Sequence, residues 1–331
     1  MARLAGRHRI VQTLLLAMLL PGAAPAAAPD PVRGPAGRLL SDGFEQGGFA
    51  PGGGLFYKNN PEQRAGKVAF GARAPLRGRG GLTLTVMPAC APDARGCSER
   101  AEVWERPRVL VPYAETVWYG FAMRLEEPLP QDGRRHVMAQ WKREIRRDAP
   151  GDFSPFLALR LYRGRLGFTV ETDFVESFRI GGPQRPQGCL PGEARVLSRP
   201  KVRQTRALVA VEAGSAPEDY PGYFDACAPA IRVTRHADLP PAGSGWIDFV
   251  VRSQPGPSGD GHIEILANGV PIVTVKGHIG HTGPGLGRNQ YFKFGPYRAS
   301  GKLPWSVSYD DFRRGPRCSD VIRVGQCPAE P

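Results

Sequence analysis

The sequence predicts an all-β protein, folded as a two-sheet antiparallel β-sandwich of the jelly-roll (concanavalin-like) type. Gly (42) and Pro (34) are abundant among the 331 residues, and almost no long stretch has the apolar spacing of an amphipathic helix. Short segments between turn residues instead alternate apolar and polar side chains, which is typical of half-buried strands. Many such antiparallel strands close most simply into two packed sheets.

The first 28 residues have the layout of a secretory signal peptide. Arg3, Arg7 and Arg9 precede an apolar run over residues 10–20, and small residues follow up to Ala28. The run is shorter than the roughly 20 residues that span a bilayer, so we expect no stable membrane insertion. Residues 29–38 are expected to form a flexible leader. The mature protein is therefore predicted to be secreted or periplasmic.

Charge narrows the choice of partner. The formal net charge is +13, and residues 1–28 hold three arginines and no acidic residue, so their removal leaves +10. Such a charge attracts anionic partners, although it also serves solubility alone. Export favours an acidic polysaccharide over nucleic acid. We expect a monomer that binds an acidic polysaccharide and no nucleic acid.

Six cysteines in a chain predicted to be exported indicate three disulfides, for which 15 pairings exist. Their spacings are not those of zinc sites, so no metal site is predicted from them. The favoured pairing closes two short loops, Cys90 with Cys97 and Cys318 with Cys327. It leaves Cys189 and Cys227 to pair and hold a long insertion.

One sandwich domain is expected over residues 39–313, followed by a tail over 314–331 with a local disulfide. The strand pattern fades at about 179–242, which is too long for an idle connection and is interpreted as a disulfide-tied insertion over one sheet face. Alternation places Val117, Tyr119 and Phe121 on one side of their strand. Strands are expected at 82–87, 117–125, 137–142, 157–162, 166–171, 246–252, 262–267, 272–276, 291–294 and 306–312.

Two dipeptides predict hairpin turns. Asn268-Gly269 separates two apolar runs and is the signal of a type I′ turn, in which both central residues take positive φ. Arg163-Gly164 occupies the same place between the runs at 157–162 and 166–171.

Three polar segments could form one site if they lie on neighbouring strands. Period two places Arg100 and Glu102 on one face of the first segment. It does the same for His136, Gln140 and Lys142 in the second, and for Tyr291, Lys293 and Tyr297 in the third. Removal of a carbon-bound proton next to a carboxylate needs a base and a cation for the developing negative charge, and these segments offer both on a concave face.

These segments resemble the Arg-x-Glu, Gln-x-His and Tyr-Phe-Lys-x-Gly-x-Tyr motifs of jelly-roll polysaccharide lyases. The wider pattern is closest to the heparin lyase I and glucuronan lyase group and more distant from alginate lyases. The resemblance covers roughly residues 40–313, and its most specific part is the last motif, Tyr291 to Arg298. It implies β-elimination on a uronic acid, with the C5 proton removed, the C4–O bond broken and a 4,5-unsaturated uronate left behind.

The resemblance also implies roles for individual residues. Tyr297 matches the catalytic tyrosine, Lys293 matches the lysine near it, and Arg100 and Gln140 match residues that contact the uronate carboxylate. Three further residues are expected to contact substrate: Tyr291, Arg298 and Glu102.

Lys142 departs from the family motif, which commonly has a histidine there. A lysine accepts a proton near neutrality only when burial or nearby cations disfavour its charged form. We therefore favour Tyr297 as base and acid, Lys142 as an electrostatic helper and His136 as a reserve base. The departure also keeps open a lectin-like sandwich that binds glycans without cleaving them, and Arg100 with Glu102 could form a merely structural ion pair.

Other chemistries lack their starting residues. No strand carries the carboxylate pair of a retaining sandwich glycosidase, and no Gly-x-Ser-x-Gly, phosphate loop or His-Glu-x-x-His occurs. The predicted reaction uses no organic cofactor. Some relatives hold a structural calcium ion, but the scattered acidic residues of this chain assign no ligand set for one.

Overall fold

The computed structural model describes residues 38–329, except for 72–74, 92–95, 152 and 221–223. The predicted signal peptide and residues 29–37 of the leader lie outside the described residues. The rest consists of strands of 2 to 13 residues joined by loops and turns, with five single-turn 3₁₀ helices among the described residues. These helices are η2 (Pro61–Gln63), η3 (Pro107–Val109), η4 (Pro200–Val202), η5 (Pro217–Asp219) and η6 (Cys318–Asp320). No helix in the described part is long and apolar enough to cross a membrane.

The strands, in chain order, are β1 (Leu40–Asp42), β2 (Leu55–Tyr57), β3 (Gly66–Phe70), β4 (Leu82–Val86), β5 (Glu99–Arg100), β6 (Val103–Glu105), β7 (Val111–Pro112), β8 (Val117–Leu125), β9 (His136–Ile145), β10 (Leu157–Tyr162), β11 (Arg165–Asp173), β12 (Phe178–Arg179), β13 (Glu193–Arg199), β14 (Gln204–Val211), β15 (Ala226–Arg235), β16 (Ile247–Gln254), β17 (Gly256–Ala267), β18 (Val270–Ile279), β19 (Leu286–Arg298) and β20 (Trp305–Gly315). All ten strands expected from the sequence are among them.

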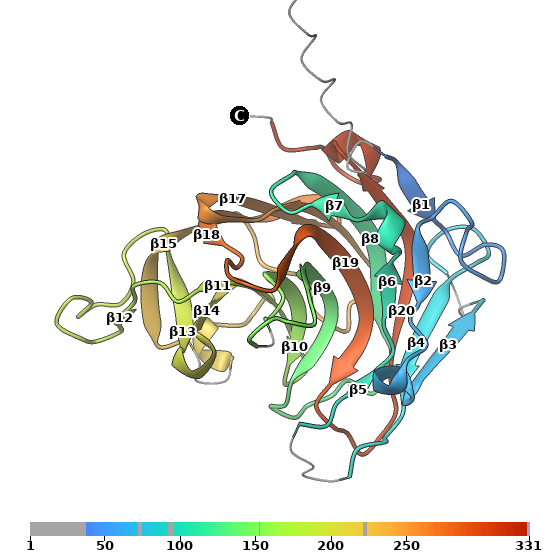
Figure 1. The fold of residues 1–331 in the computed structure, drawn as a ribbon, viewed down its shortest axis with the longest axis horizontal. Coiled ribbons are helices and arrows are strands. Elements are labelled where there is room, and N and C mark those ends of the chain that lie inside the picture. The colour runs from blue at the N-terminus through green and yellow to red at the C-terminus, as the bar shows by residue number, and fades with distance from the viewer. Residues whose placement is uncertain (1–37, 72–74, 92–95, 152, 221–223, 330–331) are drawn as a thin grey trace, which may run out of the picture. The chain divides into compact units, whose positions relative to one another are not determined.

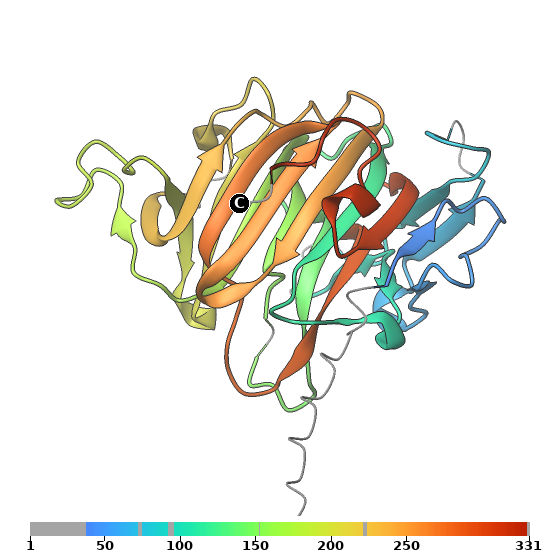
Figure 2. The same ribbon diagram turned by 90° about the horizontal axis from the view of Figure 1, so that it is seen from above.

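The strands form one continuous antiparallel sheet that folds over on itself into two layers. Neighbouring strands follow the order β3–β4–β20–β8–β16–β17–β18–β15–β13–β14–β11–β10–β9–β19–β6–β2. We call β8, β16, β17, β18 and β20 the outer layer, and β9, β10, β11, β13, β14 and β19 the inner layer. Figures 1 and 2 show β16–β18 lying over β9–β11. The predicted antiparallel sandwich is confirmed.

Aromatic rings from both layers fill the core between them. Phe168 of β11 meets Phe249 of β16 with ring centroids 5.7 Å apart, and Trp141 of β9 lies 4.6 Å from Phe292 of β19. All four rings are fully buried, and burial of each contributes roughly 1.5–3 kcal/mol. This core fixes how β9 and β19 are rotated about their axes.

Polar residues alternate with the core residues along these two strands. Because Trp141 and Phe292 point into the core, their neighbours in the sequence lie on the opposite face of the inner layer. We call this opposite face the site face. On β9 and β19 it carries Gln140, Lys142, Tyr291 and Lys293.

Both predicted hairpin turns are present. Asn268 and Gly269 have φ of 51° and 78° between β17 and β18, and Arg163 and Gly164 have φ of 49° and 78° between β10 and β11. The three disulfides follow the favoured pairing: Cys90–Cys97, Cys189–Cys227 and Cys318–Cys327.

The segment at 179–242 is more regular than its sequence suggested. It contributes β13, β14 and β15, which connect β11 to β18 within the sheet. On β13, Ala194 and Val196 are buried while Arg195 and Arg199 are only partly covered. Alternation was therefore present, but arginine on the solvated side and the Pro- and Gly-rich joints between the strands obscured it.

Candidate active site

The carboxylate of Glu102 lies at the centre of the candidate site. Its neighbours Ala101 and Val103 belong to the core, so Glu102 lies on the site face, where it is fully buried. Oε1 accepts a hydrogen bond from Nε2 of Gln140 at 2.5 Å, and Oε2 accepts one from Nζ of Lys293 at 2.9 Å. Arg100 places its guanidinium 3.6 Å from Oε2. One buried anion thus holds two cations and an amide together.

Strand register brings these residues together from three segments far apart in the sequence. Lys293 of β19 lies opposite Gln140 of β9 on one side and opposite Trp104 of β6 on the other. Farther along β19, Tyr297 lies opposite Arg100 of β5. The three polar segments singled out in the sequence are therefore adjacent.

Gly295 allows β19 to pass Glu102 closely. Its φ is 128°, and a Cβ atom there would lie 2.0 Å from the backbone oxygen of Ala101. The register of β19 against β9 shifts here, so that the step from Phe294 to Tyr297 spans one residue more than the opposing step. Such a bulge re-aims the residue that follows it, in this case Tyr297.

Tyr297 lies in strongly cationic surroundings. The guanidinium carbons of Arg100 and Arg135 are 4.0 and 4.5 Å from the centre of its ring, and Nζ of Lys293 is 6.0 Å away. Cations over an aromatic face are attracted by the ring and hold it in place. The half-buried phenol is therefore positioned, and positive charge is at hand to stabilise an anion beside it.

Burial and neighbouring charges lower the pKa of Lys293 to about 8. Loss of solvation is the main cause; Glu102 opposes it, while Lys142 and Arg100 add to it by repelling the ammonium group. Burial, and then the charge of Glu102, raise the pKa of Tyr57 to about 12. Tyr57 therefore remains a neutral phenol at neutral pH.

An aromatic pair borders the cluster. Trp104 and Tyr291 stack with centroids 5.4 Å apart and 14° between their planes. Nζ of Lys58 lies 4.2 Å from the centre of the Trp104 ring, and Tyr291 lies opposite Lys142 across the β19–β9 ladder. Stacked rings flanked by cations form a surface suited to a sugar that carries negative charge.

A family model described as polysaccharide lyase matches residues 53–313, a span that contains every residue of this cluster. The chain belongs to the polysaccharide lyase family. This confirms the family expected from the three sequence motifs, and the enzyme is a polysaccharide lyase whose substrate is a polysaccharide.

Solved structures with a similar fold include other polysaccharide lyases. The endo-β-1,4-glucuronan lyase of the fungus Trichoderma reesei is 15% identical, with a TM-score of 0.51 over 86% of this chain and 97% of that one. The alginate lyase Aly36B is 14% identical, with a TM-score of 0.39 over 88% of this chain and 99% of that one. At 15% identity, the likeness to the glucuronan lyase concerns the fold alone. No protein with a curated description matches the sequence significantly.

Two residues expected at the site of this lyase lie apart from the Glu102 cluster. The ring of His136 packs edge-on against the core residue Trp305, with centroids 5.1 Å apart. Arg298 is buried and donates from Nε to Glu99 at 2.5 Å. A bulge in β9 against β10 interrupts strict alternation, so His136 does not share the face of Gln140.

The structure adds three residues that the sequence reasoning missed. The sequence could have indicated Trp104 as a site residue, because Trp104 continues the period-two series of Arg100 and Glu102 on the same face. Arg135 and Tyr57 had no such signal. Arg135 directly precedes β9 and Tyr57 ends β2, and only the folded chain brings them to the cluster.

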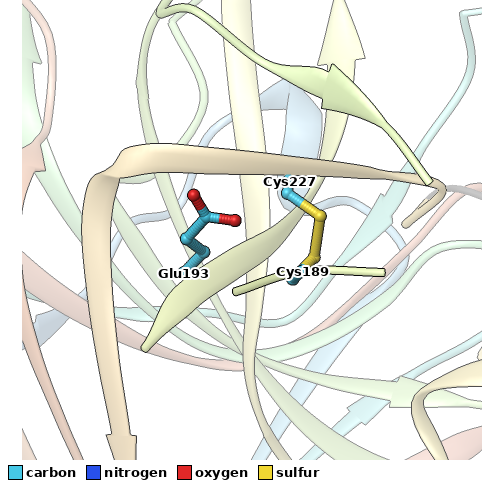
Figure 3. A group of neighbouring side chains, drawn as sticks. All are labelled: Cys189, Glu193 and Cys227. Atoms are coloured by element: carbon cyan, nitrogen blue, oxygen red, sulfur yellow. A yellow bond between two sulfur atoms is a disulfide. The ribbon is translucent and has the colours of Figure 1, made fainter. Parts of the chain in front are cut away.

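A second group of potential ligand atoms lies elsewhere and forms a disulfide. Sulfur atoms of Cys189 and Cys227 and a carboxylate oxygen of Glu193 lie within 4.8 Å of one another (Figure 3). The two sulfurs are bonded to each other, and Glu193 accepts hydrogen bonds from Arg185 at 2.6 and 3.0 Å. The group therefore offers no thiolate to a metal ion.

Proposed function

We propose that this lyase is exported and cleaves a uronate-containing polysaccharide by β-elimination, leaving a 4,5-unsaturated uronate at the new end. The observation that supports this most directly is the buried carboxylate of Glu102, which holds Lys293, Gln140 and Arg100 beside the phenol of Tyr297. A base next to a fixed group of cations is what abstraction of a proton next to a carboxylate requires.

In the proposed reaction, Arg100 and Gln140 bind the uronate carboxylate, and the charges of Lys293 and Lys142 stabilise the anion that develops on it. Tyr297, as phenolate, takes the proton from C5. The electrons of the C5–H bond form the new double bond as the C4–O bond breaks. Tyr297 then returns its proton to the leaving oxygen and is a phenolate again. No organic cofactor takes part.

Glu102 has a positioning role in this proposal. It cannot donate to the uronate carboxylate, but it fixes the donors that do. Gln140 keeps a second Nε2 hydrogen beyond the one bonded to Glu102. The side chain of Gln63 holds the main chain of Glu102 in turn, because the N–H of Glu102 donates to Oε1 of Gln63 at 2.6 Å.

The proposal of export rests on the signal-like segment at 1–28 and on the disulfides. Three bonds of this kind persist in oxidising compartments and are rare in the cytosol.

Ultraviolet absorbance of the new double bond tests the reaction. Purified protein is mixed with glucuronan, alginate, heparin and chondroitin-type chains, each compared with the same polymer after reduction of its carboxyl groups. We expect absorbance to rise with at least one acidic polymer and with none of the reduced ones. Binding without absorbance across the panel would indicate a lectin-like protein, and new reducing ends without absorbance would indicate hydrolysis.

A further inference from the structure

A second cationic cluster lies on the site face, centred two strands from Gln140. The carboxylate of Glu171 on β11 is fully buried and is shared by three arginines. Oε1 lies 3.2 Å from Arg160 and 2.7 Å from Arg206, and Oε2 lies 3.0 Å from Arg199. The arginines come from β10, β14 and β13, so four adjacent strands build the cluster (Figure 1).

These four side chains carry more positive than negative charge. Three guanidiniums and one carboxylate leave a formal excess of two positive charges. Burial alone would raise the pKa of Glu171, but the three arginines outweigh it and hold the pKa below its usual value. Burial, and then Arg206, lower the pKa of Arg160 to about 10. An incoming anion would offset this excess charge.

Exposure differs among the three arginines in a way that suits a binding site. The side chain of Arg160 is only 5% exposed and is fixed from Nε by Thr169 at 2.9 Å. The side chains of Arg206 and Arg199 are 15% and 30% exposed. Arg160 and Glu171 therefore form a buried support that orients the guanidiniums of Arg206 and Arg199. The planar forks of these guanidiniums match carboxylate and sulfate oxygens.

The cluster and the Glu102 site lie along one path across the strands. Gln140 pairs with Ala158 of β10, which pairs with Thr169 of β11. The core residues Leu159, Val170 and Ala207 alternate with the cluster on their strands, which keeps it on the site face. Three strand steps of about 4.8 Å separate β9 from β14, roughly 14 Å in all.

From this arrangement we propose that Arg199 and Arg206 bind a second oxyanion, a carboxylate or a sulfate, of the same polysaccharide chain whose uronate reacts beside Tyr297. The proposal rests on the proposed function and deepens it. The lyase would prefer chains that carry negative charge on several successive sugars, because one anion lies at the reacting sugar and another lies across β10 and β11.

Binding measurements test this without turnover. Oligosaccharide ladders of matched length, prepared from glucuronan and from heparin, are titrated into the wild-type protein and into Arg199→Ala. We expect the substitution to weaken binding of the longer members of at least one ladder about tenfold, as loss of a hydrogen bond to a charged group does. The loss should grow with chain length. In turnover, the KM value should rise more than the kcat value falls.

Arg124→Ala is the matched control. Its side chain is 20% exposed and pairs with Glu126 at 2.8 Å, but it lies on the outer layer. A loss confined to the heparin ladder assigns the anion as sulfate, and a loss on both ladders assigns it as carboxylate. Equal affinities in Arg199→Ala and Arg124→Ala at every length would overturn the proposal.

Two further results separate this proposal from the proposed function. Absence of binding and absorbance in the wild-type protein on every uronate polymer contradicts the function itself. Normal cleavage together with an unaffected Arg199→Ala contradicts only the second anion site. Thermal unfolding checks that the variants fold. Should Arg199→Ala not fold, Arg199→Lys, which keeps the charge and loses the fork, tests the same point, and wild-type affinity in it overturns the proposal.

Discussion

Nζ of Lys293 lies 2.9 Å from Oε2 of Glu102, and both side chains are buried. Buried ion pairs lose much of their attraction to the cost of removing both charges from water. The pair therefore serves mainly to fix the positions of the two side chains. It locks the ammonium of β19 to the segment that carries Arg100.

Replacing Glu102 with Gln should destabilise the protein by about 3–5 kcal/mol at neutral pH, because Lys293 loses its buried partner and must either stay charged without it or give up its proton. Urea unfolding followed by tryptophan fluorescence measures the change. Glu264→Gln is the control, since that carboxylate pairs with His262 at 2.9 Å on the outer layer. A loss below about 1 kcal/mol would show that Glu102 is not the anchor of the cluster.

The pH profile of activity should have an alkaline limb near pH 8. The pKa of Lys293 is lowered to about 8, so the amine is protonated below this pH and neutral above it. Because the proposed role of Lys293 needs the charge, kcat/KM should fall as pH rises through 8. A variant that keeps a permanent charge, Lys293→Arg, should lack this limb even if it is slower. An unchanged limb in that variant would assign it to another group.

Lys142→Gln should move the alkaline limb to higher pH. Lys142 is one of the like charges that lower the pKa of Lys293. Its removal should therefore raise that pKa and keep the ammonium protonated to higher pH. The midpoint of kcat/KM against pH measures the shift, with Lys276→Gln on the exposed side of β18 as the control. A midpoint that stays in place would mean that Lys142 does not act on Lys293.

Local patterns predicted much of the fold because the local physics agrees with the global structure. Alternation located the strands, Asn268-Gly269 located a hairpin, and loop length favoured the disulfide pairing. The site segments were found because period two places Arg100 with Glu102 and Gln140 with Lys142. A pattern along one segment does not contain the register between strands. That register decides that Lys293 lies opposite Gln140.

The remainder depends on irregularities and on distant segments. A bulge in β9 moves His136 off the site face, and the shift near Gly295 aims Tyr297; neither changes composition enough to be seen in the sequence. Arg135 reaches Tyr297 from the residue that precedes β9. In the sequence the arginines of β13 and β14 resemble loop residues. The pairing of β14 with β11, and of β13 with β14, places them around Glu171.

Removing the Cys189–Cys227 disulfide with two Ser substitutions should cost about 4 kcal/mol, because it closes a loop with a sequence separation of 38. The Cys90–Cys97 bond, with a separation of 7, should cost only about 2.4 kcal/mol by the same chain-entropy argument. Denaturant unfolding of both double variants measures the difference. Equal losses would show that contacts in the folded state, rather than loop length, determine the effect.

Tyr297→Phe should lower kcat by about 10²- to 10⁴-fold, which is the usual contribution of a positioned acid or base. The substitution removes the hydroxyl and keeps the ring, so the contacts with Arg100 and Arg135 persist. Folding and substrate affinity should therefore stay close to wild type. Initial rates from the absorbance of the unsaturated product, together with calorimetric affinities, measure the two effects separately. Tyr291→Phe, which keeps the stack on Trp104, is the control and should retain most activity. If Tyr297→Phe turns over at a wild-type rate, another group carries the proton.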